Sequence, residues 1–422
     1  MITKKQLVTI VLVCFLLVQN TGCSSFPLPA QSEPVTLRFL HEENAADYAA
    51  LAQEFNKEHP NITIELVTYK DLGDFYRSYA SKMGSADAAR LFFGASLYYA
   101  QQVPDGLLAL DTLIATDQEF PHDDFYPDAI EAMRIEGKVI GLPAGMNPFV
   151  VYANPKKFES AGIPLPQAGW TVEDFTRIAS AVHNIDSAAQ GTDRFAYGFC
   201  TDPFANDPAV FLRLFGGALA DDENQPIAPM LDQPINETAM TWYTSLFGEF
   251  QVTQPFVQSP QTAEQIRAGN CAMWLDVLSA GQYGKPSNVD ATPLPLPVYN
   301  NTPVTLAALD NYAILSKSTH PEEAWLWVRF LMDHEQASGT ILPARRSHMQ
   351  SGGFLSSVSP AVAAIARAMS ESEITHSGQV DQRLIQANML YYEAVQQVLK
   401  GDADVKTALE QAQQKALKVF GE

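Results

Sequence analysis

Polar and aromatic side chains follow two predicted strands at the point where each strand ends, and these side chains are the best placed for chemistry. Residues 41–44 (HEEN) follow the alternating string VTLRFL, and residues 94–98 (GASLY) lie at the end of the string RLFFG. Ligands of parallel α/β sheets bind beyond the carboxyl ends of the strands. Carboxylates, hydroxyls and aromatic rings there can hydrogen-bond to a small molecule or stack on it, so these loops are the first candidate site.

Residue patterns that would indicate catalysis are absent from the sequence. It contains neither a Gly-x-Ser-x-Gly elbow nor a His-Glu-x-x-His zinc motif, and its 8 histidines are scattered. The acid-rich strings PHDDFYPD and LADDENQ do not match a calcium loop. A glycosidase needs one carboxylate pair, and nothing selects a pair among the many acids. We therefore expect no enzyme activity, no metal and no cofactor, and we keep a surface enzyme as an alternative.

The elements that must position the two loops indicate an α/β fold. Apolar and polar residues alternate in VTLRFL, which predicts a strand. The next segment places Tyr48, Leu51 and Phe55 on one helical face, and ITIELVTY then predicts a second strand. Strand–helix–strand is the unit of a parallel sheet.

Later segments keep this mixed character. TVEDFTRIASAVHN predicts a helix, with Thr171 as its N-cap and Asp174 three residues on. CAMWLDV predicts a strand on which Trp274 and Asp276 share a face. There the Trp274 ring could stack on a ligand and the Asp276 carboxylate could accept a hydrogen bond from it. The string ATPLPLPVYNNTPV is too rich in proline for a central strand and predicts a connector.

Length and charge limit the class of protein. A chain of 422 residues is too long for one core, so two domains are expected. The net charge of −21, from 27 Lys+Arg against 48 Asp+Glu, argues against nucleic acid as a partner.

The first residues indicate export. Two lysines precede an apolar run at residues 7–18, which is too short to span a bilayer and predicts a secretory signal peptide. The string NTGCSS then resembles a bacterial lipoprotein signal, in which residues 1–22 are removed and Cys23 is lipidated. Residues 23–34 are rich in Ser and Pro and predict a tether to the membrane surface. Cys200 and Cys271 are expected to be buried thiols, with one bridge between them as the alternative.

A series of longer strings, in one order along the chain, indicates a family. They are LAQEFNKEHPNITIELV, DGLLALDTLI, GKVIGLPAGMNPFVVYANPKKFESAGIPLPQAGWTVEDF, AEQIRAGNCAMWLD, NYAILSKSTHPEEAWLWVRFLM and LPARR. With them the chain resembles bacterial extracellular solute-binding proteins, the sugar-type receptors of ABC importers. The resemblance covers nearly the whole chain after the tether.

The resemblance implies a two-lobed periplasmic-binding-protein-like fold of type II, with a mixed sheet flanked by helices in each lobe. The N-lobe would comprise residues 35–145 plus 305–337, and the C-lobe 146–304 plus 338–422. The AGMNP segment would be a hinge segment that lines the cleft at the first crossing, with an ordinary turn before a strand as the alternative. Further crossings would fall near residues 299–305 and 334–343. The chain would be a monomer that takes up a sugar, binds the transmembrane subunits of an ABC permease, and releases the sugar unaltered.

The resemblance also implies that the solute lies between the lobes. A neutral sugar needs aromatic plates and groups with paired donors and acceptors. The candidate ligand-binding residues are Glu42, Glu43, Phe93, Ser96, Tyr98, Asn147, Trp274, Asp276, Asp310, Asn311, Tyr312 and Arg345; Asn44 follows the same strand as the two glutamates.

Two departures from the family pattern keep other solutes open. Sugar-binding relatives often have Pro-Asp before the third strand, where this chain has Ala89-Arg90. Relatives commonly continue the later strand into Gly-Pro-Trp, where this chain has Val277-Leu278-Ser279. A polyamine or phosphoester receptor and a sensor lipoprotein therefore remain alternatives.

Overall fold

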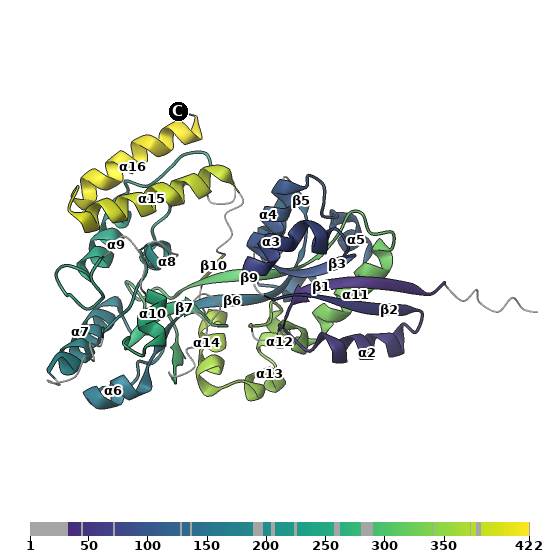
Figure 1. The fold of residues 1–422 in the computed structure, drawn as a ribbon, viewed down its shortest axis with the longest axis horizontal. Helices are drawn as coiled ribbons and strands as arrows, with labels where there is room; N and C mark the ends of the chain where they lie inside the picture. The colour runs from purple at the N-terminus through teal and green to yellow at the C-terminus, as the bar shows by residue number, and fades with distance from the viewer. Residues whose placement is uncertain are drawn as a thin grey trace, which may run out of the picture.

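The computed structural model describes residues 33–43, 45–70, 72–126, 129–135, 137–188, 197–203, 207–222, 226–256, 262–279, 290–339, 341–371, 373–376 and 381–421. The expected signal peptide, Cys23, most of the tether and Asn44 lie outside these residues. Figure 1 shows an elongated molecule with two lobes. Strands β6 (Leu142–Ala153) and β9 (Val304–Ile314) run between the lobes through the middle of the molecule.

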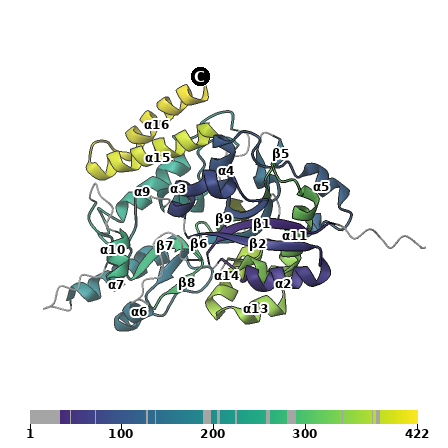
Figure 2. The same cartoon turned by 45° about the vertical axis from the view of Figure 1, so that its right-hand side comes forward.

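The first lobe is built on parallel strands. Strand β1 (Val35–Glu42) pairs in parallel with β2 (Ile62–Tyr69) and β3 (Ala88–Phe92), and β9 runs antiparallel to β3. The helices of this lobe are α2 (Tyr48–Glu58), α3 (Leu72–Met83), α4 (Phe93–Gln102), α5 (Asp111–Thr116) and α11 (Pro321–Asp333). Figures 1 and 2 show α3 and α4 above the sheet and α2 below it. The predicted strand–helix–strand unit is confirmed, because α2 joins β1 to β2 and buries Tyr48, Leu51 and Phe55.

The first crossing, where the resemblance places a hinge segment, is part of a strand. Strand β6 begins at Leu142 and pairs first with β9, with an irregularity between Pro143 and Gly145, and then with β7 (Met273–Val277). A Cβ atom on Gly145 would lie 2.5 Å from a methyl carbon of Ile341, so the close approach requires glycine. The alternative of an ordinary turn is wrong, because an irregularity in the pairing accommodates the proline-containing segment within an extended strand.

The second lobe packs helices around the far halves of these strands. Its helices are α6 (Pro155–Ala161), α7 (Val172–Ala188), α8 (Asp207–Leu214), α9 (Pro234–Ser245), α10 (Thr262–Arg267), α15 (Gln382–Lys400) and α16 (Val405–Phe420). The predicted cap of α7 is confirmed: the Asp174 N–H donates to Thr171 Oγ1 at 3.1 Å. The predicted connector is only partly irregular, because it contains β8 (Thr292–Leu294), which is antiparallel to β6.

Short elements lie beside the crossing strands or on the first lobe. Helices α12 (Arg346–Met349), α13 (Gly352–Ser357) and α14 (Pro360–Glu371) lie below β6 and β9 in Figure 1, and β10 (Glu373–His376) pairs in parallel with β9. The remaining short elements are β4 (Arg134–Ile135), β5 (Lys138–Val139) and the 3₁₀ turns η1 (His122–Asp124), η2 (Glu131–Met133) and η3 (Glu335–Ser338).

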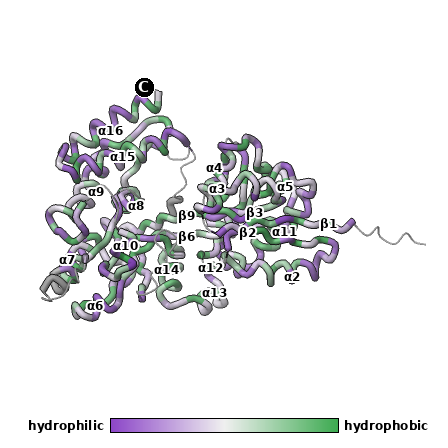
Figure 3. Tube along the Cα trace, in the orientation of Figure 1, coloured by the Kyte–Doolittle hydropathy of each residue, from purple (hydrophilic) through white to green (hydrophobic). Residues whose placement is uncertain are grey.

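Buried apolar side chains form two clusters. One contains Phe39, Phe55 and Trp327 of the first lobe, and the other contains Phe211 and Tyr391 of the second. Figure 3 shows hydrophilic and hydrophobic residues alternating along α16, as expected for a helix that packs one face. No helix among the described residues is both long enough and apolar enough to cross a membrane.

A disulfide joins Cys200 to Cys271, so the expectation of two free thiols was wrong and the alternative of one bridge is confirmed. The two residues are 71 positions apart in sequence, but their Cα atoms lie 5.6 Å apart. The sequence could not show this proximity because it depends on how residues 197–203 lie beside β7.

Candidate functional site

The carboxyl ends of β1, β2 and β3 face the second lobe in the middle of the molecule (Figure 1). Glu42 ends β1, and the next residue, Glu43, donates its backbone N–H to the Tyr69 carbonyl at the end of β2. Both glutamates are exposed. Asp310 of β9 pairs with Phe92, the last residue of β3. The structure thus brings three of the predicted carboxylates to the sheet edge where ligands of α/β proteins bind.

Asp310 is held by a buried arginine. Its carboxylate keeps 20% of its surface exposed, and its Oδ2 lies 3.1 Å from Nη2 of Arg90, which is 3% exposed. Burial raises the pKa of Asp310, and the charge and hydrogen bond of Arg90 oppose that rise. Burial by itself would lower the pKa of Arg90, but its interactions with Tyr48 and Asp310 raise it above the usual value. The guanidinium is therefore charged at neutral pH.

Asn147 lies on the crossing strand β6, on the same face of the strand pair as Asp310. It pairs with Ala308 of β9, and residues 308 and 310 share a face because side chains alternate along a strand. The Asn147 amide is half-buried and exchanges two hydrogen bonds with Ser279: its Nδ2 donates to the hydroxyl at 2.8 Å, and its Oδ1 accepts from the backbone N–H at 3.0 Å. Asn147 therefore ties the end of β7 to the crossing.

The second lobe has two buried carboxylates, those of Asp202 and Asp207, at the corresponding edge. Residues 197–200 run parallel to β7, so Thr201 and Asp202 follow at its carboxyl end. One oxygen of Asp207 accepts from the Thr201 hydroxyl at 2.7 Å and from the Asp202 N–H at 3.0 Å. Burial raises the pKa of Asp207 to about 8, and the negative charges of Asp202 and Asp276 add to the rise. The Asp207 carboxyl is thus largely protonated at neutral pH.

Sequence reasoning did not single out Asp202 or Asp207, and it noted Arg90 only as a departure from the family. An available signal was the pair of Asp-Pro dipeptides, Asp202-Pro203 and Asp207-Pro208, directly after the apolar string GFC. Asp-Pro after an apolar run indicates a turn at the end of a strand. No comparable signal shows that Arg90 is buried, since that depends on three segments distant in sequence.

Several predicted site residues are buried within the protein. Ser96 and Asn311 are fully buried, and the Ser96 hydroxyl donates to Asn311 Oδ1 at 2.9 Å. Tyr312 is buried and donates to the Ala337 carbonyl at 3.3 Å. This conformation gives these three side chains no exposure to a solute, and the structure assigns them to packing at the crossing.

The predicted pair on β7 is also internal. The expectation that Trp274 and Asp276 share a strand face is confirmed by the alternation of β7, but they are only 2% and 1% exposed. The Trp274 ring stacks on Tyr152 with centroids 5.6 Å apart, and the Tyr152 hydroxyl donates to the Leu278 carbonyl at 2.6 Å. In this conformation the Trp274 ring is part of the hydrophobic core, and its contact with a solute stays a prediction.

The predicted aromatic residues of α4 differ in what the structure describes. Tyr98 is half-buried and packs edge-on against Tyr76 and Tyr79 of α3, with ring centroids 5.0 and 5.2 Å away. Tyr76 is 40% exposed. Phe93 begins α4, and its side chain lies outside the described part of the chain.

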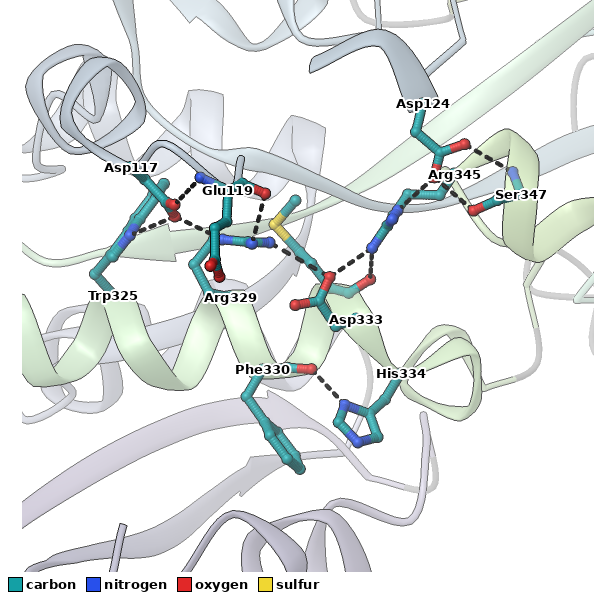
Figure 4. A network of polar contacts seen from close by, with 11 residues as sticks. Asp117, Glu119, Asp124, Trp325, Arg329, Phe330, Asp333, His334, Arg345 and Ser347 are labelled. Carbon is teal, nitrogen blue, oxygen red and sulfur yellow. Dashed lines mark hydrogen bonds and ion pairs between the residues drawn. The ribbon is translucent and has the colours of Figure 1, made fainter. Parts of the chain in front are cut away.

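Arg345 fastens the third crossing to the first lobe. Figure 4 shows its guanidinium between Asp124 and Asp333, at 2.7 and 2.5 Å from their carboxylate oxygens. Arg329 lies beside this cluster and makes a similar pair with Asp117 at 2.7 Å. Arg345 is 17% exposed, and its hydrogen-bond and ion-pair partners are protein groups. The structure shows it in a structural role, and its contact with a solute stays a prediction.

A cavity of about 530 Å³ lies apart from the carboxylates described above. Its walls include Phe149 and Pro295 of the second lobe and Ile365 of α14. Its lining includes neither Asp310 nor Glu42. Within the described ranges, no three His, Cys, Asp or Glu side chains gather as metal ligands would.

Comparisons with known proteins agree with this architecture. The family model described as bacterial extracellular solute-binding protein matches residues 40–338. An ABC substrate-binding protein from Listeria monocytogenes, solved with cycloalternan, has a TM-score of 0.70 at 18% identity, over 92% of this chain and 100% of that one.

Two further solved structures have similar folds. The cyclic alpha-maltosyl-1,6-maltose binding protein of Arthrobacter globiformis has a TM-score of 0.72 at 16% identity, covering 92% of this chain and 99% of that one. A Mycobacterium tuberculosis protein solved with glycerophosphocholine has a TM-score of 0.68 at 16% identity, covering 92% and 98%. At these identities the likeness shows a shared two-lobed fold. Because the family model spans most of the chain, this protein belongs to the bacterial extracellular solute-binding protein family.

Proposed function

We propose that this chain is the receptor of an ABC importer, and that it captures a mono- or oligosaccharide between its lobes and delivers it to a membrane permease. The observation that carries the proposal is Asp310, a partly exposed carboxylate fixed on a strand that joins the lobes. Solved relatives bound to cycloalternan and to other sugars support a carbohydrate as the cargo.

The carboxylates and amides supply what a sugar needs. Sugar hydroxyls donate hydrogen bonds, and the accessible carboxylates of Glu42, Glu43 and Asp310 accept them. Asn147 lies on the crossing between the lobes with a half-buried amide. Tyr76 is 40% exposed and packs edge-on against Tyr98, so its ring offers apolar surface for sugar C–H groups.

Binding to both lobes explains how the receptor would signal that it is loaded. A solute that contacts both walls binds the closed arrangement more tightly and shifts the population toward it. Moving a two-state equilibrium from 1:99 to 99:1 takes about 5.5 kcal/mol of differential affinity. A few charge-assisted hydrogen bonds, each contributing about 1.5–3 kcal/mol, supply that amount. No bond in the solute is broken.

Isothermal titration calorimetry with purified protein tests the proposal. Maltotriose, mannotriose, cycloalternan and mannitol form the carbohydrate panel, and spermidine and glycerophosphocholine represent the alternative solutes. We expect micromolar or tighter binding of at least one carbohydrate, and recovery of that carbohydrate unchanged. Binding of spermidine or glycerophosphocholine alone would replace the sugar proposal, and release of hydrolysis products would indicate an enzyme.

We also propose that the protein is held at the outer face of the cell membrane by a lipid on Cys23. The family is extracellular, and the sequence around Cys23 supports the anchor. The N-lobe of residues 35–145 plus 305–337 and the C-lobe of 146–304 plus 338–422 would then act as one monomeric receptor on a short tether. Metabolic labelling with an alkyne fatty acid should mark the wild type and not a Cys23→Ala variant; equal labelling of both would refute the anchor.

A further inference from the structure

Arg90 connects three segments that meet at the crossings between the lobes. Its Nη1 donates to the Tyr48 hydroxyl at 2.9 Å and to the Ala337 carbonyl at 3.2 Å. Its Nη2 donates to the Ser338 carbonyl at 2.9 Å and lies 3.1 Å from the Asp310 carboxylate. These partners belong to α2, to the third crossing and to the second crossing strand β9.

This arrangement leaves Arg90 unable to bind a solute directly. Its side chain is 3% exposed, and the guanidinium donors at both Nη atoms already have protein partners. The remaining donor, Nε–H, is buried without a hydrogen-bond partner. Asp310 is the member of the ion pair that reaches solvent, because 20% of its side chain is exposed.

Arg90 favours the charged form of Asp310. Burial of the carboxyl raises its pKa, and Arg90 provides the opposing interaction. The other titratable groups near it give no such help. His41 is buried, and burial lowers its pKa, which keeps the ring neutral. Glu42 is acidic, and Tyr48, Tyr69 and Tyr312 have pKa values raised by burial and are neutral.

We propose that Arg90 is a specificity-determining positioning residue: by holding the Asp310 carboxylate in an ion pair at 3.1 Å, it makes the crossing strand a hydrogen-bond acceptor that selects hydroxyl-bearing solutes without a phosphate group and rejects phosphate-bearing ones. The inference rests on the proposed function, because it assumes that a solute occupies the space beside Asp310. A carboxylate accepts from a hydroxyl but repels a phosphate. Arg90, which could attract a phosphate, is covered by Asp310 and by the crossing.

Three variants and one matched control test the inference. Arg90→Met removes the charge with a side chain of similar length, Arg90→Lys keeps the charge, and Asp310→Asn removes the carboxylate. Arg329→Met is the control, because Arg329 is also largely buried and pairs with an aspartate of the first lobe, Asp117, away from Asp310. Maltotriose and glycerophosphocholine are the probes, titrated between pH 5 and pH 9.

In the wild type we expect maltotriose to bind and glycerophosphocholine not to bind. Arg90→Met should weaken maltotriose at least tenfold at pH 6 and recover part of the loss by pH 9, because Asp310 without Arg90 ionises only at higher pH. Arg90→Lys should stay within about fivefold of the wild type, and Arg329→Met within twofold. Asp310→Asn should weaken maltotriose at least tenfold without the recovery at high pH. Parallel pH profiles for the wild type and Arg90→Met, or tighter wild-type binding of glycerophosphocholine than of maltotriose, would overturn the inference.

A titration without any solute separates this inference from the proposed function. The Asp310 carboxyl carbon can be followed by ¹³C NMR in protein labelled at aspartate, with Asp310→Asn identifying the resonance. Its pKa should rise by at least one unit in Arg90→Met and stay unchanged in Arg329→Met. If no carbohydrate binds the wild type, the proposed function fails, and an equal Asp310 pKa in wild type and Arg90→Met would refute the role of Arg90 as well.

Discussion

Removing the Cys200–Cys271 disulfide should destabilise the second lobe. The bond ties residues 197–203, which lead to Thr201 and Asp202, to the start of β7. It closes a loop with a sequence separation of 71. The loop-entropy relation then gives about 4 kcal/mol at 25 °C, chiefly because the bond restricts the unfolded chain. For a lobe of this size, that corresponds to a fall in Tm of roughly 10 °C.

The assay compares a Cys200→Ala/Cys271→Ala variant with the wild type, each with and without dithiothreitol. Thermal unfolding is followed by tryptophan fluorescence, and Ellman titration of denatured protein counts free thiols. The reduced wild type should unfold near the Tm of the double variant, and the double variant should not respond to dithiothreitol. This comparison separates the cross-link from the small cavities that alanine leaves at two buried sites.

Three results would refute the reasoning. A Tm that falls by less than about 2 °C in both the reduced wild type and the variant would show that the bond restricts little unfolded-state freedom. Free thiols in protein purified from an oxidising compartment would show that the bond does not form. A large loss in the variant alone would assign the stability to packing of the cysteine side chains.

Other predictions concern single side chains. The free energy of unfolding of Asp207→Asn should rise relative to that of the wild type by roughly 1.4 kcal/mol per pH unit between about pH 4 and pH 8. The cause is the raised pKa of Asp207: over this range the native carboxyl holds a proton that the unfolded chain releases, so the wild type loses stability as pH rises. Urea melts that give the same difference between variant and wild type at pH 5 and at pH 8 would contradict this. Gly339→Ala should lower the free energy of unfolding by more than about 3 kcal/mol, since the φ of Gly339 is +65° and a Cβ would lie 1.6 Å from the Ala45 carbonyl oxygen. Gly401→Ala is the control: its φ is +78° but the Cβ would lie in open space, so it should lower stability by only about 1 kcal/mol. Similar Tm values for the two variants would refute the clash at Gly339. Trp274→Ala should cost about 3–5 kcal/mol because the ring is buried, and calorimetry that shows lost sugar affinity with unchanged stability would place the ring in the solute site.

Local signals in the sequence predicted the elements well. Alternation in VTLRFL, the helical face of Tyr48, Leu51 and Phe55, and the Thr171 cap act over a few residues, and the structure confirms each of them. The position of Glu42 and Glu43 at a strand end followed from the same short-range patterns. The order of motifs along the chain also predicted the family and the two-lobed fold.

The sequence left alternatives open at the crossings, where distant segments decide the conformation. Proline and glycine in AGMNP left an ordinary turn as the alternative to a hinge segment, and pairing with β9 on one edge and a bridge to Leu342 show that the segment is extended. Trp274 looked as suited to stacking on a sugar as to a core, and only the neighbouring Tyr152 ring shows which surface it meets. Periodicity cannot distinguish these outcomes, because it reports which residues share a face and not what covers that face.

By itself, the sequence determined the class of protein, most strands and helices, and the strand end at which Glu42 and Glu43 lie. The tertiary structure alone decided that Cys200 meets Cys271, that Arg345 pairs with Asp124, and that Arg90 lies beneath Asp310. The physical reason is range. Strand alternation and helix caps depend on residues a few positions apart, whereas these three pairings join side chains 71 or more positions apart in the chain, and they form only when the lobes fold.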